Sequence, residues 1–172
     1  DLTDEKGVLC GQILADLGAQ VIKVENPAGD AARRIGPFYH DDRGPQTSLF
    51  WFAYNRGKKS ITLDIKTPLG KEIFLHLVKA ADLVIESFPP SYMDQLGLGY
   101  GDLDAVNPKI VLTSITPFGS TGPYSQFKAS DIVVMAYSGM MYLLGDSDRP
   151  PVRIGFPQAF FHQFSSNEEF YH

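Results

Sequence analysis

The sequence has little cysteine, no long apolar run and no excess of positive charge, and each shortage removes a class of protein. Cys10 is the single cysteine in 172 residues, so the chain can form neither an internal disulfide framework nor a cysteine-based metal cluster. A lone cysteine fits a reducing compartment, and we expect a cytoplasmic location. No apolar run approaches the roughly 18 residues of a membrane span, and the start shows no basic-then-apolar signal segment.

The charge balance disfavours two kinds of partner. Lys and Arg number 15 and Asp and Glu number 20, which gives a formal net charge of -5. Nucleic acids and anionic membranes both select basic protein surfaces, so neither is expected as the main partner. A small local basic site for a phosphate group remains compatible with this charge.

Several catalytic fingerprints are missing as well. The four histidines are scattered, and none lies at metal-ligand spacing from Cys, Asp or Glu, so no metal is expected. No G-x-S-x-G sequence is present to form the nucleophile elbow of a serine hydrolase. The glycines of "GLGYG" (97–101) follow a helical segment and open no βαβ unit, which favours a plain turn over a dinucleotide site.

Short runs of β-branched residues alternate with amphipathic segments along the chain. The runs predicted as strands are "VIKVE" (21–25), "SITLD" (60–64), "LVIES" (83–87), "IVLTSI" (110–115) and "VRIGF" (152–156). Helices are expected within 7–17, 48–55, 66–82 and 130–145, the third capped by Thr67 and the last by Ser130 or Asp131. This alternation predicts an α/β fold with an open, mostly parallel sheet and helices on both faces.

Two loops are candidates for ligand binding. The three cations of "NRGKKS" (55–60) could hold a phosphate, although the P-loop glycine spacing is absent and a solvated basic turn is an equal alternative. The loop "TPFGSTGPY" (116–124) follows a strand end, where open parallel sheets usually bind ligands. A simple connecting loop explains that segment equally well.

Six segments follow one another in the order found in the family III CoA-transferases of the formyl-CoA, carnitine and bile-acid type. These are "GQILADLGAQVIKVENPAGD", "NRGKKSITLDIKTPLGKEIF", "ADLVIESFPPSYMDQLGLGYGDL", "NPKIVLTSITPFGSTGPY", "DIVVMAYSGMMYLLGD" and "PPVRIGFPQA". The chain thus resembles that family over nearly every residue up to about 161. The resemblance implies a Rossmann-like large domain that binds CoA, a smaller second domain and a dimer of interlocked chains. It also implies that residues 1–172 are the amino-terminal part of the large domain, without the small one.

The same resemblance places several residues beside coenzyme A. The implied contacts are Asn26, Leu63, Lys66, Ser87, Phe88 and Lys128. Asn26 and Gln95 stand where some members carry arginine, so phosphate binding at those two points is weaker or different. The set makes physical sense, since lysines suit phosphates and the Phe88 ring suits the face of an adenine.

Members of this family are thought to use an aspartate carboxylate that attacks the acyl-CoA carbonyl. By the resemblance, this position is occupied by Phe160 here, and a phenylalanine cannot be a nucleophile. Asp131 and His162 remain as catalytic candidates. A helix N-cap would also explain Asp131, and a partly buried structural histidine would also explain His162.

Three functions therefore compete at this point. The first is a CoA-transferase with altered chemistry, which exchanges CoA between an acyl-CoA and a carboxylic acid, with CoA as a substrate thioester. The second is a non-catalytic CoA-binding subunit whose related partner supplies the aspartate. The third is a plain α/β binding domain. For the first two we expect a homodimer or a heterodimer with a related subunit.

Overall fold

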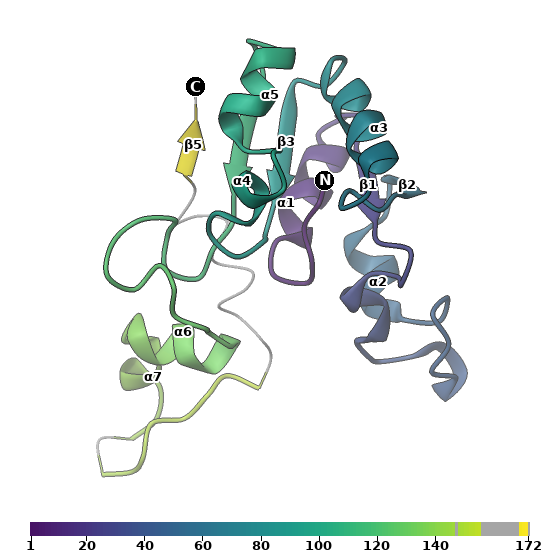
Figure 1. Ribbon diagram of the computed structural model, residues 1–172. Helices are drawn as coiled ribbons and strands as arrows, with labels where there is room; N and C mark the ends of the chain where they lie inside the picture. Colours follow the sequence, from purple (N-terminus) through teal and green to yellow (C-terminus); the bar gives the residue numbers. More distant parts are fainter. Residues whose placement is uncertain (147, 156–168, 172) are drawn as a thin grey trace.

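The computed structural model describes residues 1–146, 148–155 and 169–171, whose strands and helices form an open α/β arrangement (Figure 1). The strands are β1 (Ile22–Glu25), β2 (Lys59–Thr62), β3 (Leu83–Glu86), β4 (Val111–Ser114) and β5 (Glu169–Tyr171). The α-helices are α1 (Val8–Asp16), α2 (Leu49–Tyr54), α3 (Pro68–Val78), α4 (Tyr92–Gln95), α5 (Tyr100–Val106), α6 (Asp131–Tyr137) and α7 (Met140–Leu143). Two short 3-10 helices, η1 (Ala31–Arg34) and η2 (Tyr39–Asp41), precede α2.

The first two residues join the strands into one layer. β1 pairs in parallel with β2, β3 pairs in parallel with β4, and β5 lies antiparallel to β4. The Leu2 amide donates to the Ile85 carbonyl at 2.7 Å, and the Asp1 carbonyl accepts from the Val24 amide at 2.9 Å. The order across the layer is therefore β2, β1, residues 1–2, β3, β4 and β5.

Helices cover both faces of this layer. On one face, Phe74 and Val78 of α3 and Leu103 of α5 pack against strand residues such as Val84 and Leu112 in the larger core. On the other face, Cys10 of α1 packs with Ile85 and Ile115. Because successive strand side chains point to opposite faces, the neighbours Val84 and Ile85 belong to the two different cores. The predicted fold class is confirmed.

Two local predictions are wrong. No strand forms at 152–155 of "VRIGF", and Phe156 lies outside the described residues. Pro150 and Pro151 remove backbone donors just before this segment, and the available edge of β4 is paired by β5 instead. The helix expected over 130–145 is divided into α6 and α7, because Gly139 adopts a left-handed conformation with φ 76°.

The remaining predicted strands and helices are confirmed, whereas the turn predicted at 97–101 is replaced in part by the start of α5 at Tyr100. Four of the predicted strands correspond to β1 to β4. The Thr67 hydroxyl accepts a hydrogen bond from the Gly70 amide at 3.0 Å and so caps α3 as expected. Within the part of the chain that the structure describes, no helix is both long and apolar enough to cross a membrane.

Candidate functional site

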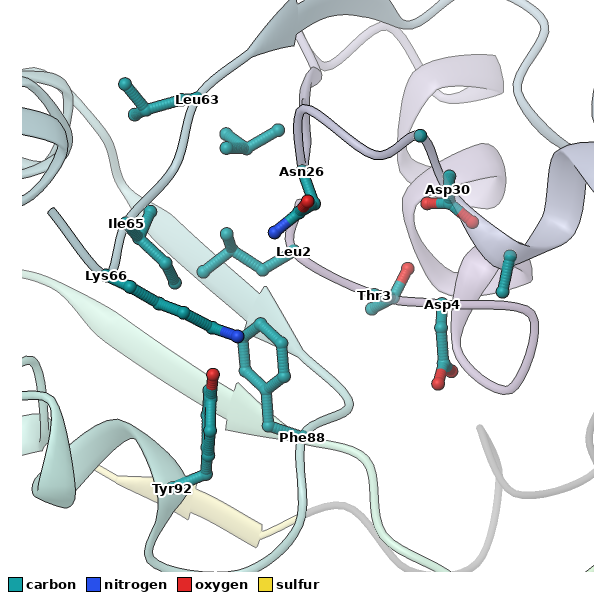
Figure 2. A pocket seen from close by; sticks show the side chains of 13 residues that line it. Leu2, Thr3, Asp4, Asn26, Asp30, Leu63, Ile65, Lys66, Phe88 and Tyr92 are labelled. Carbon is teal, nitrogen blue, oxygen red and sulfur yellow. The ribbon is translucent and has the colours of Figure 1, made fainter. Parts of the chain in front are cut away.

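A cavity of about 210 Å³ opens at the carboxyl ends of the parallel strands (Figure 2). Its walls are formed by the segments that follow β1, β2 and β3. The start of the chain, which lies between β1 and β3 in the layer, forms the remaining wall. The lining residues are Leu2, Thr3, Asp4, Val24, Asn26, Gly29, Asp30, Ala31, Leu63, Ile65, Lys66, Phe88 and Tyr92. The cavity thus collects residues from four distant stretches of sequence.

The order of the strands explains this location. From residues 1–2 the chain goes to β1 and β2 on one side of the layer, and later to β3 and β4 on the other side. Residues 1–2 and β3 are neighbours in the layer, but the chain leaves them toward opposite faces of the layer. Open α/β sheets bind ligands in the crevice at such a point, outside the carboxyl ends of the strands.

One end of the cavity combines a cation with two aromatic rings. Phe88 and Tyr92 lie with ring centroids 4.9 Å apart at an interplanar angle of 40°. In Figure 2 the Lys66 side chain points toward the Phe88 ring, and the Tyr92 hydroxyl points toward the same space. Lys66 is exposed, and among the described residues its ammonium forms no ion pair. This end can accept an anion beside a flat ring.

The opposite wall is held by buried ion pairs. The Lys23 ammonium lies 2.9 Å from Asp30 Oδ2 and 3.7 Å from Asp1 Oδ1, and each of these side chains is at most 7% exposed. Asp30 Oδ1 also accepts from the Ala32 amide at 2.8 Å, and Lys23 donates to the Thr3 carbonyl. Lys23 lies on β1, so these contacts fasten the Asn26–Ala31 wall of the cavity to the sheet.

A second set of contacts fastens the segment after β3. The Ser87 hydroxyl accepts from the Asp4 amide at 2.8 Å and donates to Asp4 Oδ1 at 2.9 Å. Glu86 Oε2 accepts from the Phe88 amide at 2.5 Å and so holds the backbone that carries the ring. Burial raises the pKa of Glu86, although a hydrogen bond from Ser114 opposes the shift. Ser87 therefore links two walls of the cavity.

Four of the six implied CoA contacts meet in the cavity, namely Asn26, Leu63, Lys66 and Phe88. Ser87 is buried behind them and does not line the cavity. Lys128 is exposed in the loop before α6 and is also absent from the lining.

The catalytic candidates lie elsewhere. Asp131 is buried, with 6% of its surface exposed, and it is the first residue of α6. Ser130 is at the N-cap position, so the explanation of Asp131 as the N-cap is wrong. Phe160 and His162 fall outside the described residues.

The two loops that were candidates for ligand binding do not contribute to the cavity. Lys58 of "NRGKKS" is buried and donates to Asp1 Oδ2 and to the Val8 carbonyl, both at 2.8 Å. Burial, assisted by the nearby charge of Lys23, lowers the pKa of Lys58 to about 7. Because two of its three N–H donors have internal acceptors and its side chain is 1% exposed, Lys58 is not available to a phosphate. In the loop 116–124, Phe118 and Tyr124 pack with Phe127 and Tyr137 in an aromatic cluster and do not line the cavity.

Sequence reasoning missed four polar lining residues, namely Thr3, Asp4, Asp30 and Tyr92. Asp30 ends the segment "NPAGD", in which nothing indicates that its carboxylate meets a buried lysine. No local pattern marks Thr3, Asp4 or Tyr92 as a binding residue, although Tyr92 lies in the family-like segment 81–103. Lys23, between the apolar residues Ile22 and Val24 of a predicted strand, was the available signal, since a buried lysine requires a partner.

A comparison with protein families adds to this geometry. The model of CoA-transferase family III matches residues 5–163. The chain belongs to this family. Among the described residues no group of three or more His, Cys, Asp or Glu is placed to hold a metal ion.

Characterised relatives cover most of the chain. It is 43% identical over 160 residues to the succinyl-CoA:(R)-benzylsuccinate CoA-transferase subunit BbsE of Thauera aromatica, which covers 93% of the chain and 39% of the relative. It is 45% identical over 152 residues to the succinate–glutarate CoA-transferase of Agrobacterium fabrum, with 87% of the chain and 38% of the relative covered. The chain therefore spans about two fifths of these relatives.

Solved structures agree with the fold. The crystal structure of a CAIB/BAIF family protein from Brucella suis matches with a TM-score of 0.84 and 42% identity, over 92% of this chain and 42% of that one. The structure of an aspartate-to-alanine mutant of Rv3272 from Mycobacterium tuberculosis matches with a TM-score of 0.78 and 39% identity. That match covers 92% of this chain and 42% of the mutant.

Proposed function

We propose that residues 1–172 are the amino-terminal, CoA-binding part of the large domain of a family III CoA-transferase. The full protein would move CoA between an acyl-CoA and a carboxylic acid. The observation that carries the proposal is the cavity at the switch point of the sheet, where Lys66 and Phe88 meet Asn26 and Leu63. The names of the relatives support the reaction, because they describe CoA transfer involving succinate, glutarate or benzylsuccinate.

The cavity residues have separate tasks in this proposal. The Lys66 ammonium supplies charge to a phosphate of CoA, and the Phe88 ring packs against the adenine. Leu63 and Ile65 give the nucleotide an apolar wall, and the Asn26 amide adds a neutral donor where some members have arginine. Lys128 lies outside the cavity lining, in the loop before α6, and would have to extend from that loop to contact a CoA phosphate.

Replacing Lys66 by Ala in the full-length protein is expected to weaken CoA binding about tenfold. The reason is the loss of one charge-assisted contact to a phosphate, for which about 1.5 kcal/mol is typical. Isothermal titration calorimetry with CoA measures the change. Lys79→Ala is the matched control, because Lys79 is an exposed lysine at the far end of α3. Equal affinities of the Lys66 variant and the wild type would contradict the assignment of the cavity to CoA.

A second candidate function is a non-catalytic CoA-binding subunit of a heteromeric transferase. Two observations favour it. Phe160 occupies the position that the resemblance assigns to the nucleophilic aspartate, and the relative from Thauera aromatica is named as a subunit. In that arrangement a related partner chain would supply the carboxylate, and this chain would bind CoA without reacting with it.

The two functions differ in the covalent chemistry of the chain. In the family reaction a carboxylate attacks the acyl-CoA carbonyl, releasing CoA thiolate and forming a mixed anhydride. The thiolate then attacks the enzyme carbonyl of the anhydride, which gives an enzyme–CoA thioester and the free acid. If Phe160 replaces the nucleophile, the full-length chain alone is expected to show no such adduct by intact-protein mass spectrometry after acyl-CoA treatment. An adduct mapped to Asp131 or to any other carboxylate of this chain would refute the subunit function and favour an active enzyme.

A further inference from the structure

We propose that Tyr92 is a ligand-binding residue whose hydroxyl donates a hydrogen bond to a phosphate of the CoA nucleotide. This assignment rests on the proposed function of the cavity. It concerns a residue that lies in a family-like segment (81–103) but is not among the CoA contacts that the resemblance implies. The chemical group recognised is a phosphate on the ribose next to an adenine ring that packs on Phe88.

The position of Tyr92 is the first support. Tyr92 begins α4, directly after a turn in which Ser91 adopts a left-handed conformation with φ 64°. The Tyr92 amide donates to the Pro89 carbonyl at 3.0 Å, so this tight turn brings the chain back toward β3. As a result, the half-buried Tyr92 side chain lines the cavity.

The surroundings of the hydroxyl are the second support. The Tyr92 ring packs on Phe88 with a centroid distance of 4.9 Å, which holds the phenol at the edge of the aromatic surface. Figure 2 shows its hydroxyl pointing to the space that the Lys66 ammonium also reaches. No described residue accepts a hydrogen bond from this hydroxyl, and no described carboxylate pairs with Lys66. A donor and a cation with no partner among the described residues thus lie beside one ring.

This arrangement matches the chemistry of a nucleotide phosphate. A phosphate has several acceptor oxygens, so it can bind an ammonium and a phenol at the same time. The phosphate and the adenine are both attached to the ribose, which fixes the distance between them. A phosphate would therefore lie beside the edge of an adenine that packs on Phe88. Tyr92 therefore supplies a donor in a cavity where the lining residue Asn26 stands in place of the arginine of some members.

The test uses Tyr92→Phe in the full-length protein, because this change removes the hydroxyl and keeps the ring on Phe88. CoA affinity is expected to fall about tenfold, as for one hydrogen bond to a charged acceptor. Tyr39→Phe is the control, since Tyr39 is an exposed tyrosine of η2 outside the cavity lining, and its affinity should equal that of the wild type.

Titration with dephospho-CoA, which lacks the 3′-phosphate, identifies the phosphate. If Tyr92→Phe weakens CoA but not dephospho-CoA, the hydroxyl binds the 3′-phosphate; equal weakening of both assigns it to the diphosphate. Unchanged affinity for both ligands, with normal binding by the wild type, would overturn the role of Tyr92 alone. A wild-type protein that binds neither ligand would overturn the proposed function and this assignment together.

Discussion

Replacing Lys23 by Met is expected to lower the free energy of unfolding by about 3–5 kcal/mol, the usual cost of removing one partner from a buried ion pair. Lys23 is 1% exposed, and its ammonium lies 2.9 Å from Asp30 Oδ2. Asp1 would keep its contact with Lys58 at 2.8 Å, but the buried Asp30 carboxylate would lose the ammonium that it contacts at 2.9 Å. Urea unfolding of the full-length protein, followed by circular dichroism, measures the loss.

A double variant separates the charge from the packing. Lys23→Met combined with Asp30→Asn removes both charges and keeps a side-chain oxygen to accept from the Ala32 amide. This protein is expected to recover part of the stability that Lys23→Met loses. Lys109→Met, at an exposed position, should change stability by less than about 0.5 kcal/mol. A Lys23→Met protein as stable as the Lys109 variant would show that the ion pair contributes nothing.

Gly70→Ala is expected to destabilise the protein by about 3 kcal/mol, at the upper end of the range for overpacking. In a helix interior this change normally stabilises by up to about 1 kcal/mol, because alanine has the higher helix propensity. At Gly70 a Cβ would overlap with the carbonyl oxygen of Asp64 and lie 2.6 Å from its carbonyl carbon. The backbone of Asp64 would have to move, and with it the adjacent segment that carries Ile65 and Lys66 into the cavity.

Gly101→Ala is the matched control, because here the replacement of glycine by alanine is expected to stabilise the protein. Gly101 lies in α5, and a Cβ there would meet nothing within 4 Å. It should raise the free energy of unfolding by about 0.5 kcal/mol through helix propensity alone. Thermal unfolding of the two alanine variants against the wild type checks the difference. Stabilisation by both changes would mean that Asp64 and Gly70 are not in close contact.

Local patterns succeeded where local chemistry decides the conformation. The β-branched runs of β1 to β4 and the Thr67-Pro68 start of α3 carry strong local signals, and all were predicted correctly. The segment "VRIGF" has a similar composition, yet a strand requires a partner edge, and β5 pairs with that of β4. The aromatic and aliphatic residues after Ser130 predicted one helix, whereas Gly139 ends α6 and separates it from α7.

By itself the sequence determined the α/β class, the family resemblance and the absence of a disulfide framework, because composition, periodicity and the order of motifs are properties of the chain alone. The match of Phe160 to the nucleophile position is of the same kind and stays a prediction. Only the tertiary structure decided that Lys23 and Lys58 are buried and that Tyr92 faces Lys66. These facts depend on which strands lie side by side, since the strand order places the segments after residues 2, 25, 62 and 86 around one cavity. Strand pairing is a contact between distant residues, and no pattern within a short stretch of sequence specifies it.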